Sequence, residues 1–266
     1  LNAFVTLMEV EAPYIARKAR AGQFIILRVN EEGERIPLTI ADHDENKGTV
    51  TIMFQKVGKT TLLLDTLEEG DAILDFVGPL GRATELEGHR RVAVVGGGVG
   101  CAIAYPEAKA FHEAGARVDM IAGFRNKDIV MLEEEFAAVS DRLFVMTDDG
   151  SNGNKGFVTV KLKELLDAGE AYDLVMAIGP LPMMRAVAEL TKGYGIKTMV
   201  SMNPIMIDGT GMCGGCRLTV GGETRFACVD GPEFDAHEID WDEAMKRLTQ
   251  YREQEHTCRL LFTGEA

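Results

Sequence analysis

The sequence predicts an antiparallel β-barrel, then an α/β module with a parallel sheet, and then a C-terminal segment organised around cysteines. Three observations predict this fold class. Short strands separated by turn residues fill residues 1–88. Strands alternate with helices over residues 89–203. From residue 204 to residue 266 both periodicities end, and glycine and cysteine dominate until a final amphipathic stretch. We therefore expect three domains with boundaries at residues 88/89 and 203/204.

The strands of the first module are rich in β-branched and aromatic residues, and Gly, Asp, Asn or Pro bounds each of them. They are "AGQFIILRV", "RIPLTIAD", "GTVTIMFQKV" and "GDAILDFVGPLG". Strands this short and this close together are typical of a small antiparallel barrel. The stretch "KTTLLLDTLEEG" predicts one helix that interrupts them.

The second module opens with "RVAVVGGGVG", a buried strand that runs directly into glycines. Glycine at this turn lets the backbone approach a pyrophosphate, which then sits on the helix N-terminus. The G-x-G-x-x-G fingerprint is incomplete, because its third glycine falls on Cys101. A later strand ends in a second glycine turn, "AIGPLPMM". Two such turns on one sheet edge favour a nucleotide cleft over a purely structural turn.

No acidic residue closes the second strand of this module, where a ribose-binding Asp or Glu is usual. Arg125 stands there instead. An arginine at this place either binds a 2′-phosphate or lies solvated in its loop, so the residues alone leave the choice between NADH and NADPH open.

Charge and composition exclude other classes of protein. The formal net charge of −14 argues against nucleic-acid binding, which needs a basic face. No apolar run approaches the roughly 18 residues of a membrane-spanning helix. The five cysteines are an odd number, and three of them cluster, so they predict a metal site in a cytoplasmic protein rather than a disulfide framework.

The clustered thiols are Cys213, Cys216 and Cys228, and Asp208 precedes them in the array D-x4-C-x2-C-x11-C. Plant-type 2Fe–2S proteins use C-x4-C-x2-C with a distant fourth cysteine, in a glycine-rich loop. We therefore favour a 2Fe–2S cluster with Asp208 as the fourth ligand, ahead of Cys101 or Cys258. The alternative is structural zinc held by the three cysteines with His237 or Asp208.

Two stretches of the barrel have the residue types of an anion site. "RIPLTI" begins with Arg35, and "VGKTT" places a glycine and two hydroxyls at the start of the predicted helix. Each has a simpler explanation, since a barrel arginine often pairs with a carboxylate and Thr60 has the side chain of an N-cap.

Taken together, R-x-P-L-T, G-K-T-T, G-G-G-x-G, G-P-x-P-M-M and the C-terminal cysteine loop resemble the ferredoxin–NADP reductase superfamily. The resemblance is to members that end in a 2Fe–2S loop. One such family, the electron-transfer subunits of dihydroorotate dehydrogenase B, carries four cysteines. The other, the small subunits of NADH-dependent ferredoxin–NADP oxidoreductase (sulfide dehydrogenase), has an Asp in the first position, as Asp208 is here. The resemblance departs at the N-terminus, where a first barrel strand is expected to be shortened or absent.

This resemblance implies three cofactors, FAD, NAD(H) and a 2Fe–2S cluster, and residues that hold each of them. For FAD it implies Arg35, Pro37, Leu38, Thr39, Met53, Phe54, Gln55, Gly58, Thr60 and Thr61. For the nicotinamide nucleotide it implies Gly97, Gly98, Val99, Gly100, Arg125, Asp149, Gly179, Pro180 and Met183. For the cluster it implies Asp208, Cys213, Cys216 and Cys228.

The resemblance also implies a function and a partner. The function is that of the flavin and iron–sulfur subunit of an electron-bifurcating oxidoreductase. The partner is a large glutamate-synthase-like subunit that carries flavin and 4Fe–4S clusters and reaches ferredoxin. This chain has no second cysteine set for 4Fe–4S clusters, so bifurcation requires that partner. Two alternatives remain open: a subunit that serves a dihydroorotate dehydrogenase, and a zinc-stapled nucleotide-binding module without redox activity.

Overall fold

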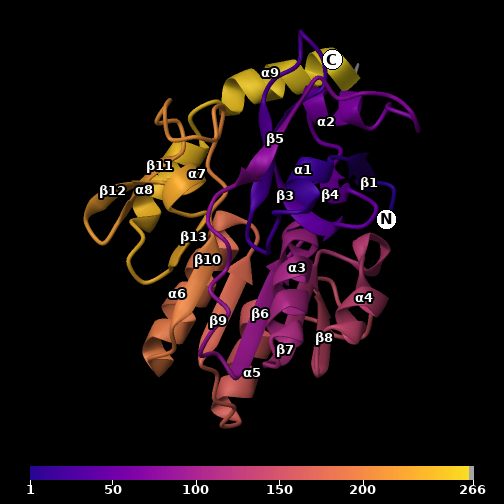
Figure 1. Cartoon of the computed structure of the whole chain (residues 1–266). Helices are drawn as coiled ribbons and strands as arrows, with labels where there is room; N and C mark the ends of the chain where they lie inside the picture. Colours follow the sequence, from indigo (N-terminus) through magenta and orange to yellow (C-terminus); the bar gives the residue numbers. More distant parts are fainter. Residues whose placement is uncertain (264–266) are drawn as a thin grey trace.

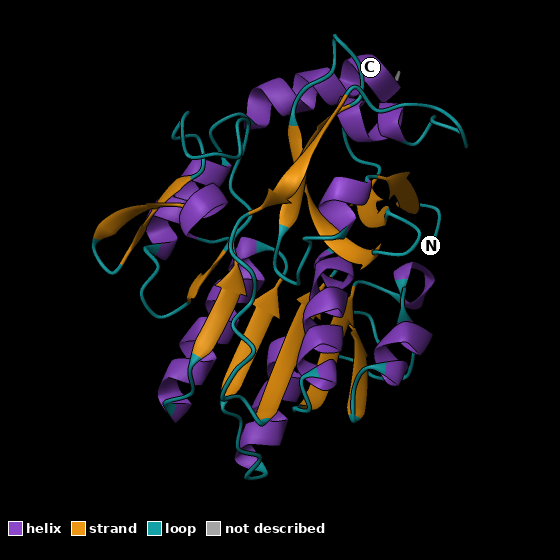
Figure 2. Cartoon of the chain, in the orientation of Figure 1, coloured by secondary structure: helices purple, strands orange, loops and turns teal. Residues whose placement is uncertain are grey.

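The computed structural model describes residues 1–263, and its first part is a five-stranded antiparallel sheet that matches the predicted barrel (Figures 1 and 2). The strands follow the order β1-β4-β3-β2-β5. The elements are β1 (Val5–Glu11), α1 (Pro13–Ala16), β2 (Phe24–Arg28), β3 (Ile36–Asp44), β4 (Thr49–Gln55), α2 (Lys59–Leu64) and β5 (Asp75–Leu80). The strand nearest the N-terminus, β1, has seven residues, and the absence or shortening of a further strand before it stays a prediction.

Alternation along the barrel strands sends one set of side chains into a separate apolar core. Ile25 and Leu27 of β2, Ile40 of β3, and Ile52 and Phe54 of β4 are almost completely buried in it. Burying each such side chain contributes about 1.5–3 kcal/mol. The strands that carry the predicted flavin residues are therefore stabilised by a hydrophobic core of their own.

The second part is a six-stranded sheet in the order β13-β10-β9-β6-β7-β8, parallel except for β13. Its elements are β6 (Arg91–Gly97), α3 (Gly100–Glu113), β7 (Arg117–Phe124), η1 (Lys127–Ile129), α4 (Glu133–Ala138), β8 (Arg142–Thr147), α5 (Val158–Asp167), β9 (Leu174–Ile178), α6 (Leu181–Tyr194) and β10 (Thr198–Ser201). The predicted alternation of strands and helices is confirmed.

Helices cover both faces of this sheet, because successive strand residues point to opposite sides. Val92 and Val94 of β6 pack with α3 and α4, whereas Ala93 and Val95 pack with α5 and α6. All four side chains are completely buried. A sheet buried on both faces reads as the continuous apolar run seen at the start of β6.

The C-terminal segment is built onto the edge of the parallel sheet. It contains β11 (Arg217–Val220), β12 (Glu223–Phe226), α7 (Ala227–Asp230), β13 (Glu233–Asp235), α8 (Trp241–Leu248) and α9 (Arg252–Thr263). β11 and β12 form a hairpin that the sequence did not predict, and β13 pairs with β10 of the α/β sheet. The amphipathic C-terminal stretch forms two helices, and the second, α9, lies against α2 of the barrel (Figure 1). No helix among residues 1–263 is long and apolar enough to cross a membrane.

Candidate cofactor-binding sites

The two predicted glycine turns meet at the carboxyl edge of the parallel sheet. A Cβ placed on Gly97 would collide with Met183 Sδ, and one on Gly100 would lie 2.6 Å from Gly179 Cα. Only glycine permits this approach of the two turns. Gly98 differs: its φ is +57°, and a Cβ there would meet no atom within 4 Å. The surface beside Gly98 is therefore open for a ligand to approach the backbone.

Cys101, which stands where the fingerprint glycine is missing, is a core residue. Its side chain is completely buried, and its Sγ would lie 2.9 Å from a Cβ on Gly96. Burial raises the pKa of this thiol to about 12. The Cys101 thiol fills the contact between β6 and α3 and lies away from the cysteine loop.

Arg125 and Asp149 lie on the same sheet edge as the glycine turns, after β7 and β8. The Asp149 N–H donates to the Arg125 carbonyl at 3.3 Å, and both side chains are exposed. The Asp149 carboxylate accepts the Ser151 N–H at 2.9 Å, and hydrogen bonds from Ser151 lower the pKa of Asp149. An ionised carboxylate and an arginine therefore flank this edge.

We expect Gly98→Ala to raise the KM for the nicotinamide nucleotide by about tenfold, because a methyl group would occupy the open surface next to the predicted pyrophosphate site. Gly115→Ala is the matched control. Gly115 lies beyond the opposite end of α3, has φ +85°, and a Cβ on it would likewise meet no atom within 4 Å. Both variants carry the same left-handed backbone penalty of about 1 kcal/mol. Steady-state kinetics with an artificial electron acceptor check this prediction; equal KM values in the two variants would contradict it.

In the barrel, the predicted flavin residues lie on β3 or directly before it, on β4, and at the N-terminal end of α2. Phe54 is 1% exposed and packs in the barrel core, so only its backbone is available to a ligand. The Thr60 hydroxyl is buried and has no hydrogen-bond partner among the described residues. A buried hydroxyl without a partner is costly, and a bound ligand atom would satisfy it. This observation fits a cofactor at the start of α2.

The neighbouring residues support the same place. The Gly58 N–H donates to Thr61 Oγ1 at 3.1 Å, so Thr61 caps α2, and a Cβ on Gly58 would meet nothing within 4 Å. Arg35 pairs with a carboxylate, as its simpler explanation expected, and it also contacts the cysteine loop. Its Nε donates to the Ile207 carbonyl at 2.9 Å, and its Nη1 lies 3.4 Å from Asp75. Arg35 therefore ties the barrel to the cysteine loop while it pairs with a carboxylate.

The cysteine loop brings the predicted cluster ligands near one another in two pairs. The Cys228 N–H donates to Cys216 Sγ at 3.4 Å, and both side chains are 2% exposed. Burial, and then the hydrogen bond with Cys216, raise the pKa of Cys228 to about 12. Cys213 is exposed and accepts the Gly215 N–H at 3.4 Å, and this hydrogen bond lowers the pKa of its thiol.

Asp208 lies next to Cys213, but its carboxylate is turned into its own loop. Oδ2 accepts the Thr210 hydroxyl at 2.6 Å, the Thr210 N–H at 2.9 Å and the Met212 N–H at 3.1 Å. These hydrogen bonds lower the pKa of Asp208. Within residues 1–263, no three His, Cys, Asp or Glu side chains converge closely enough to hold a metal ion. Ligation by the four residues therefore stays a prediction.

The donors nevertheless suit an iron–sulfur cluster better than zinc with His237. Asp208, Cys213 and Cys216 stand on one glycine-rich loop, and Cys228 lies in α7 beside Cys216. Two of the sulfurs, those of Cys213 and Cys216, accept backbone N–H bonds, as cluster sulfurs do. His237 instead contacts Thr191 at 3.2 Å, and Cys258 lies in α9.

Comparisons with known proteins agree with this geometry. Residues 203–240 match the model of the iron–sulfur cluster binding domain of dihydroorotate dehydrogenase B. The chain is 50% identical to the Thermotoga maritima homologue of the dihydroorotate dehydrogenase B electron transfer subunit, over 92% of this chain and 86% of that one. The Geobacillus kaustophilus electron transfer subunit is 37% identical, over 82% and 86%. The chain belongs to the family of dihydroorotate dehydrogenase B-type electron-transfer subunits.

A solved structure gives the same answer for the fold of this family member. The structure of the NADH-dependent reduced ferredoxin-NADP oxidoreductase, described for flavin-based electron bifurcation, matches with a TM-score of 0.93 and 46% identity. The match covers 98% of this chain and 94% of that one. The predicted resemblance, the barrel and α/β fold, and the class of iron–sulfur flavoprotein oxidoreductase that transfers electrons are confirmed.

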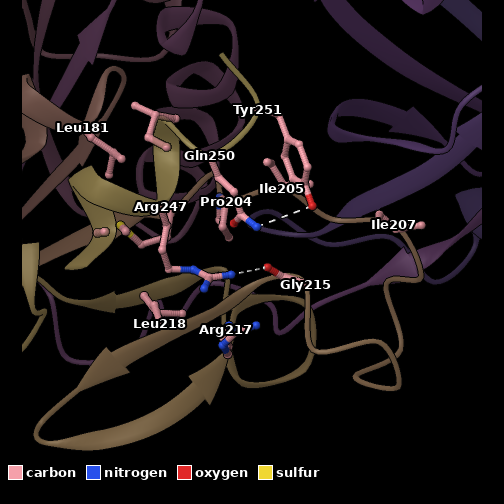
Figure 3. Close-up of a pocket in the computed structure, with 13 residues that line it drawn as sticks. Leu181, Pro204, Ile205, Ile207, Gly215, Arg217, Leu218, Arg247, Gln250 and Tyr251 are labelled. Atoms are coloured by element: carbon pink, nitrogen blue, oxygen red, sulfur yellow. Dashed lines mark hydrogen bonds between the residues drawn. The ribbon is translucent and has the colours of Figure 1, made fainter. Parts of the chain in front are cut away.

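In this electron-transfer subunit, sequence reasoning missed two arginines that hold the cysteine loop. Arg217 Nη1 donates to the Gly214 carbonyl at 3.2 Å. Arg247 Nη2 donates to the Gly215 carbonyl at 2.9 Å (Figure 3). Both line a cavity of about 140 Å³ between the loop and α8. Arg217 follows Cys216 directly, and that adjacency was the signal that could have found it. Arg247 is 32 residues from its partner, and no spacing rule indicates it.

Proposed function

We propose that this chain exchanges electrons between NAD(H) and a large partner subunit, using FAD and a 2Fe–2S cluster, in an electron-bifurcating NADH-dependent ferredoxin–NADP oxidoreductase. The observation that most supports this proposal is the likeness along the whole chain to that oxidoreductase, at 46% identity and a TM-score of 0.93. Asp208 in place of a first cysteine favours the same assignment.

The chemistry would belong to the cofactors: FAD, when bound, would supply hydride chemistry with the nicotinamide, and the cluster would supply one-electron chemistry. The residues of the chain bind these cofactors and set their positions. Gly97, Gly98 and Gly100 admit the dinucleotide phosphates to the sheet edge, and the Thr60 hydroxyl and the start of α2 receive FAD. Asp208, Cys213, Cys216 and Cys228 hold the cluster.

Contacts between the barrel and the cysteine loop support electron transfer between the two sites. Arg35 of the barrel bonds the Ile207 carbonyl, one residue before Asp208. A Cβ on Gly209 would lie 2.8 Å from both Ile26 and Leu80, so the loop packs directly on β2 and β5. The proposed flavin and cluster sites are therefore held in one packed unit.

The nucleotide is NADH in this proposal. The ionised Asp149 carboxylate at the nucleotide edge disfavours the added phosphate of NADPH. Anaerobic titration of the purified, coloured protein tests this assignment. NADH is expected to bleach the visible absorption at a lower concentration than NADPH, and a preference for NADPH would overturn the assignment. A colourless protein that contains zinc would overturn the redox function itself.

A second function has its own support, because the family model and the curated relatives are those of dihydroorotate dehydrogenase B. Anaerobic purification of the tagged chain from its native cells, with mass spectrometry of the co-purifying chain, separates the two. A large, cysteine-rich, glutamate-synthase-like flavoprotein supports the bifurcating enzyme. A dihydroorotate dehydrogenase instead assigns the chain to that reaction.

Asp208 variants test the proposed cluster ligand. We expect Asp208→Cys to keep a cluster with changed EPR g-values, since a thiolate is a softer ligand than a carboxylate. Asp208→Ala should lose most of its iron. EPR and iron analysis of the purified variants measure both effects. Wild-type spectra and iron content in both variants would remove Asp208 from the cluster.

A further inference from the structure

Two guanidinium groups hold successive carbonyls of the turn between Cys213 and Cys216. Arg217 Nη1 donates a hydrogen bond to the Gly214 carbonyl oxygen at 3.2 Å, and Arg247 Nη2 donates one to the Gly215 carbonyl oxygen at 2.9 Å. The two side chains come from different elements, β11 and α8, and approach the turn from the wall of the same cavity (Figure 3). Gly214 has φ +66°, so the turn itself depends on glycine.

A single peptide group links the hydrogen bond from Arg217 to a hydrogen bond that a cysteine sulfur accepts. The Gly214 carbonyl and the Gly215 N–H belong to the same peptide, and that N–H donates to Cys213 Sγ at 3.4 Å. A cation on the carbonyl polarises the peptide and strengthens its N–H as a donor. The guanidinium of Arg217 therefore acts on the Cys213 sulfur without touching it.

Arg247 polarises the next peptide group in the same way. Its donation to the Gly215 carbonyl polarises the peptide that carries the Cys216 N–H. Neither arginine pairs with a carboxylate in the part of the chain that the structure describes, although the protein carries a net charge of −14. Their positive charges are consequently not neutralised by a neighbouring side chain.

We propose that Arg217 and Arg247 are positioning residues that raise the reduction potential of the cluster carried by this loop. This inference rests on the proposed function. Reduction adds negative charge at the cluster, so cations and strengthened N–H donors stabilise the reduced form more than the oxidised form. The two arginines thereby set how readily the cluster on this loop accepts an electron.

The test is the midpoint potential of the reconstituted full chain, measured by EPR-monitored redox titration. Arg217→Gln and Arg247→Gln are each expected to reduce the equilibrium constant for one-electron reduction of the cluster about threefold, which is about 28 mV. Arg225→Gln is the matched control, because Arg225 lies on the same hairpin and makes the same change in charge but pairs with Glu223 at 2.7 Å.

Potentials in the two variants equal to that of Arg225→Gln would overturn the inference. A wild-type protein without a reducible cluster signal would instead refute the proposed function, so the two failures are distinguishable. A second readout covers a variant that binds no iron. In the cluster-free full chain, we expect the Gly215 amide proton to move upfield in Arg217→Gln and to stay in place in Arg225→Gln. An unmoved Gly215 signal in Arg217→Gln contradicts the inference.

Discussion

We expect Arg142→Met to lower the free energy of unfolding by about 3–5 kcal/mol at neutral pH, because the change leaves a buried carboxylate without its cation. Asp119 on β7 is 1% exposed, and Arg142 on β8 contacts both of its oxygens, with Nε at 2.8 Å from Oδ1. The Tyr172 hydroxyl donates to the same carboxylate at 2.7 Å. Methionine preserves most of the packing of the arginine stem while removing the charge.

The pH dependence of this loss follows from the Asp119 titration. Burial raises the pKa of the carboxyl, but hydrogen bonds from Arg142 and Tyr172 outweigh burial and hold the pKa below its ordinary value. A lowered pKa in the folded state stabilises the protein above the ordinary carboxyl pKa of about 4, and this stability is lost as the pH falls through the folded-state pKa. The deficit of Arg142→Met should therefore shrink in acid.

Denaturant unfolding measured at several pH values checks this prediction. The exposed Arg90 provides the control, because Arg90→Met should stay within about 0.5 kcal/mol of the wild type. The double variant with Asp119→Asn should be more stable than Arg142→Met alone, since the unpaired charge is gone. A deficit below about 1 kcal/mol in Arg142→Met would show that water reaches Asp119.

Local patterns predicted most of the fold because the relevant forces act locally along the chain. The apolar run of β6, its glycine turn and the helix of α3 follow directly from "RVAVVGGGVG" and the residues after it. The hairpin of β11 and β12 was missed because each strand has only four residues, too few to show a clear alternation next to the glycines of the loop. The break between α8 and α9 likewise has no glycine or proline to mark it.

In the candidate sites, too, some contacts were predictable from the sequence and others were not. The meeting of Gly97 with Met183 was predictable, since the carboxyl ends of parallel strands share one edge. Bonds between distant segments were not predictable. Arg35 reaches Ile207 across 172 residues, and Arg247 reaches Gly215 across 32. Such contacts depend on how the modules pack, and residue type alone does not specify which carbonyl an arginine finds.

A pair of glutamates at the junction of the modules, one buried and one half-buried, gives the second large effect. Glu107 of α3 is 1% exposed, and Glu233 begins β13. Thr84, between β5 and β6, has its hydroxyl oxygen 2.6 Å from Glu107 Oε2 and 2.7 Å from Glu233 Oε1. The hydroxyl has one proton, so it donates to one carboxyl group and accepts from the other. The arrangement requires at least one protonated glutamate.

We expect the stability of the whole chain to fall by about 3 kcal/mol as the pH rises from about 4.5 to above 7. Burial, and then the charge of Glu233, raise the pKa of Glu107 well above its ordinary value, and burial raises the pKa of Glu233 from 4.5 to about 7. A raised carboxyl pKa means that the folded state holds a proton that the unfolded chain has released. This stabilisation is complete below the unfolded-state pKa and is lost as the pH passes the folded-state pKa.

Glu233→Gln should make this part of the stability curve shallower, because the amide removes one titrating carboxyl and the charge that helps raise the pKa of Glu107. Glu238→Gln on the same segment is exposed and should leave the curve of the wild type unchanged. Urea unfolding between about pH 4 and pH 8 measures all three proteins, and parallel curves for wild type and Glu233→Gln would rule out the shared proton. Since Glu107 lies on α3 of the α/β module and Glu233 on β13 of the C-terminal segment, loss of that proton weakens the contact between these two parts of the protein.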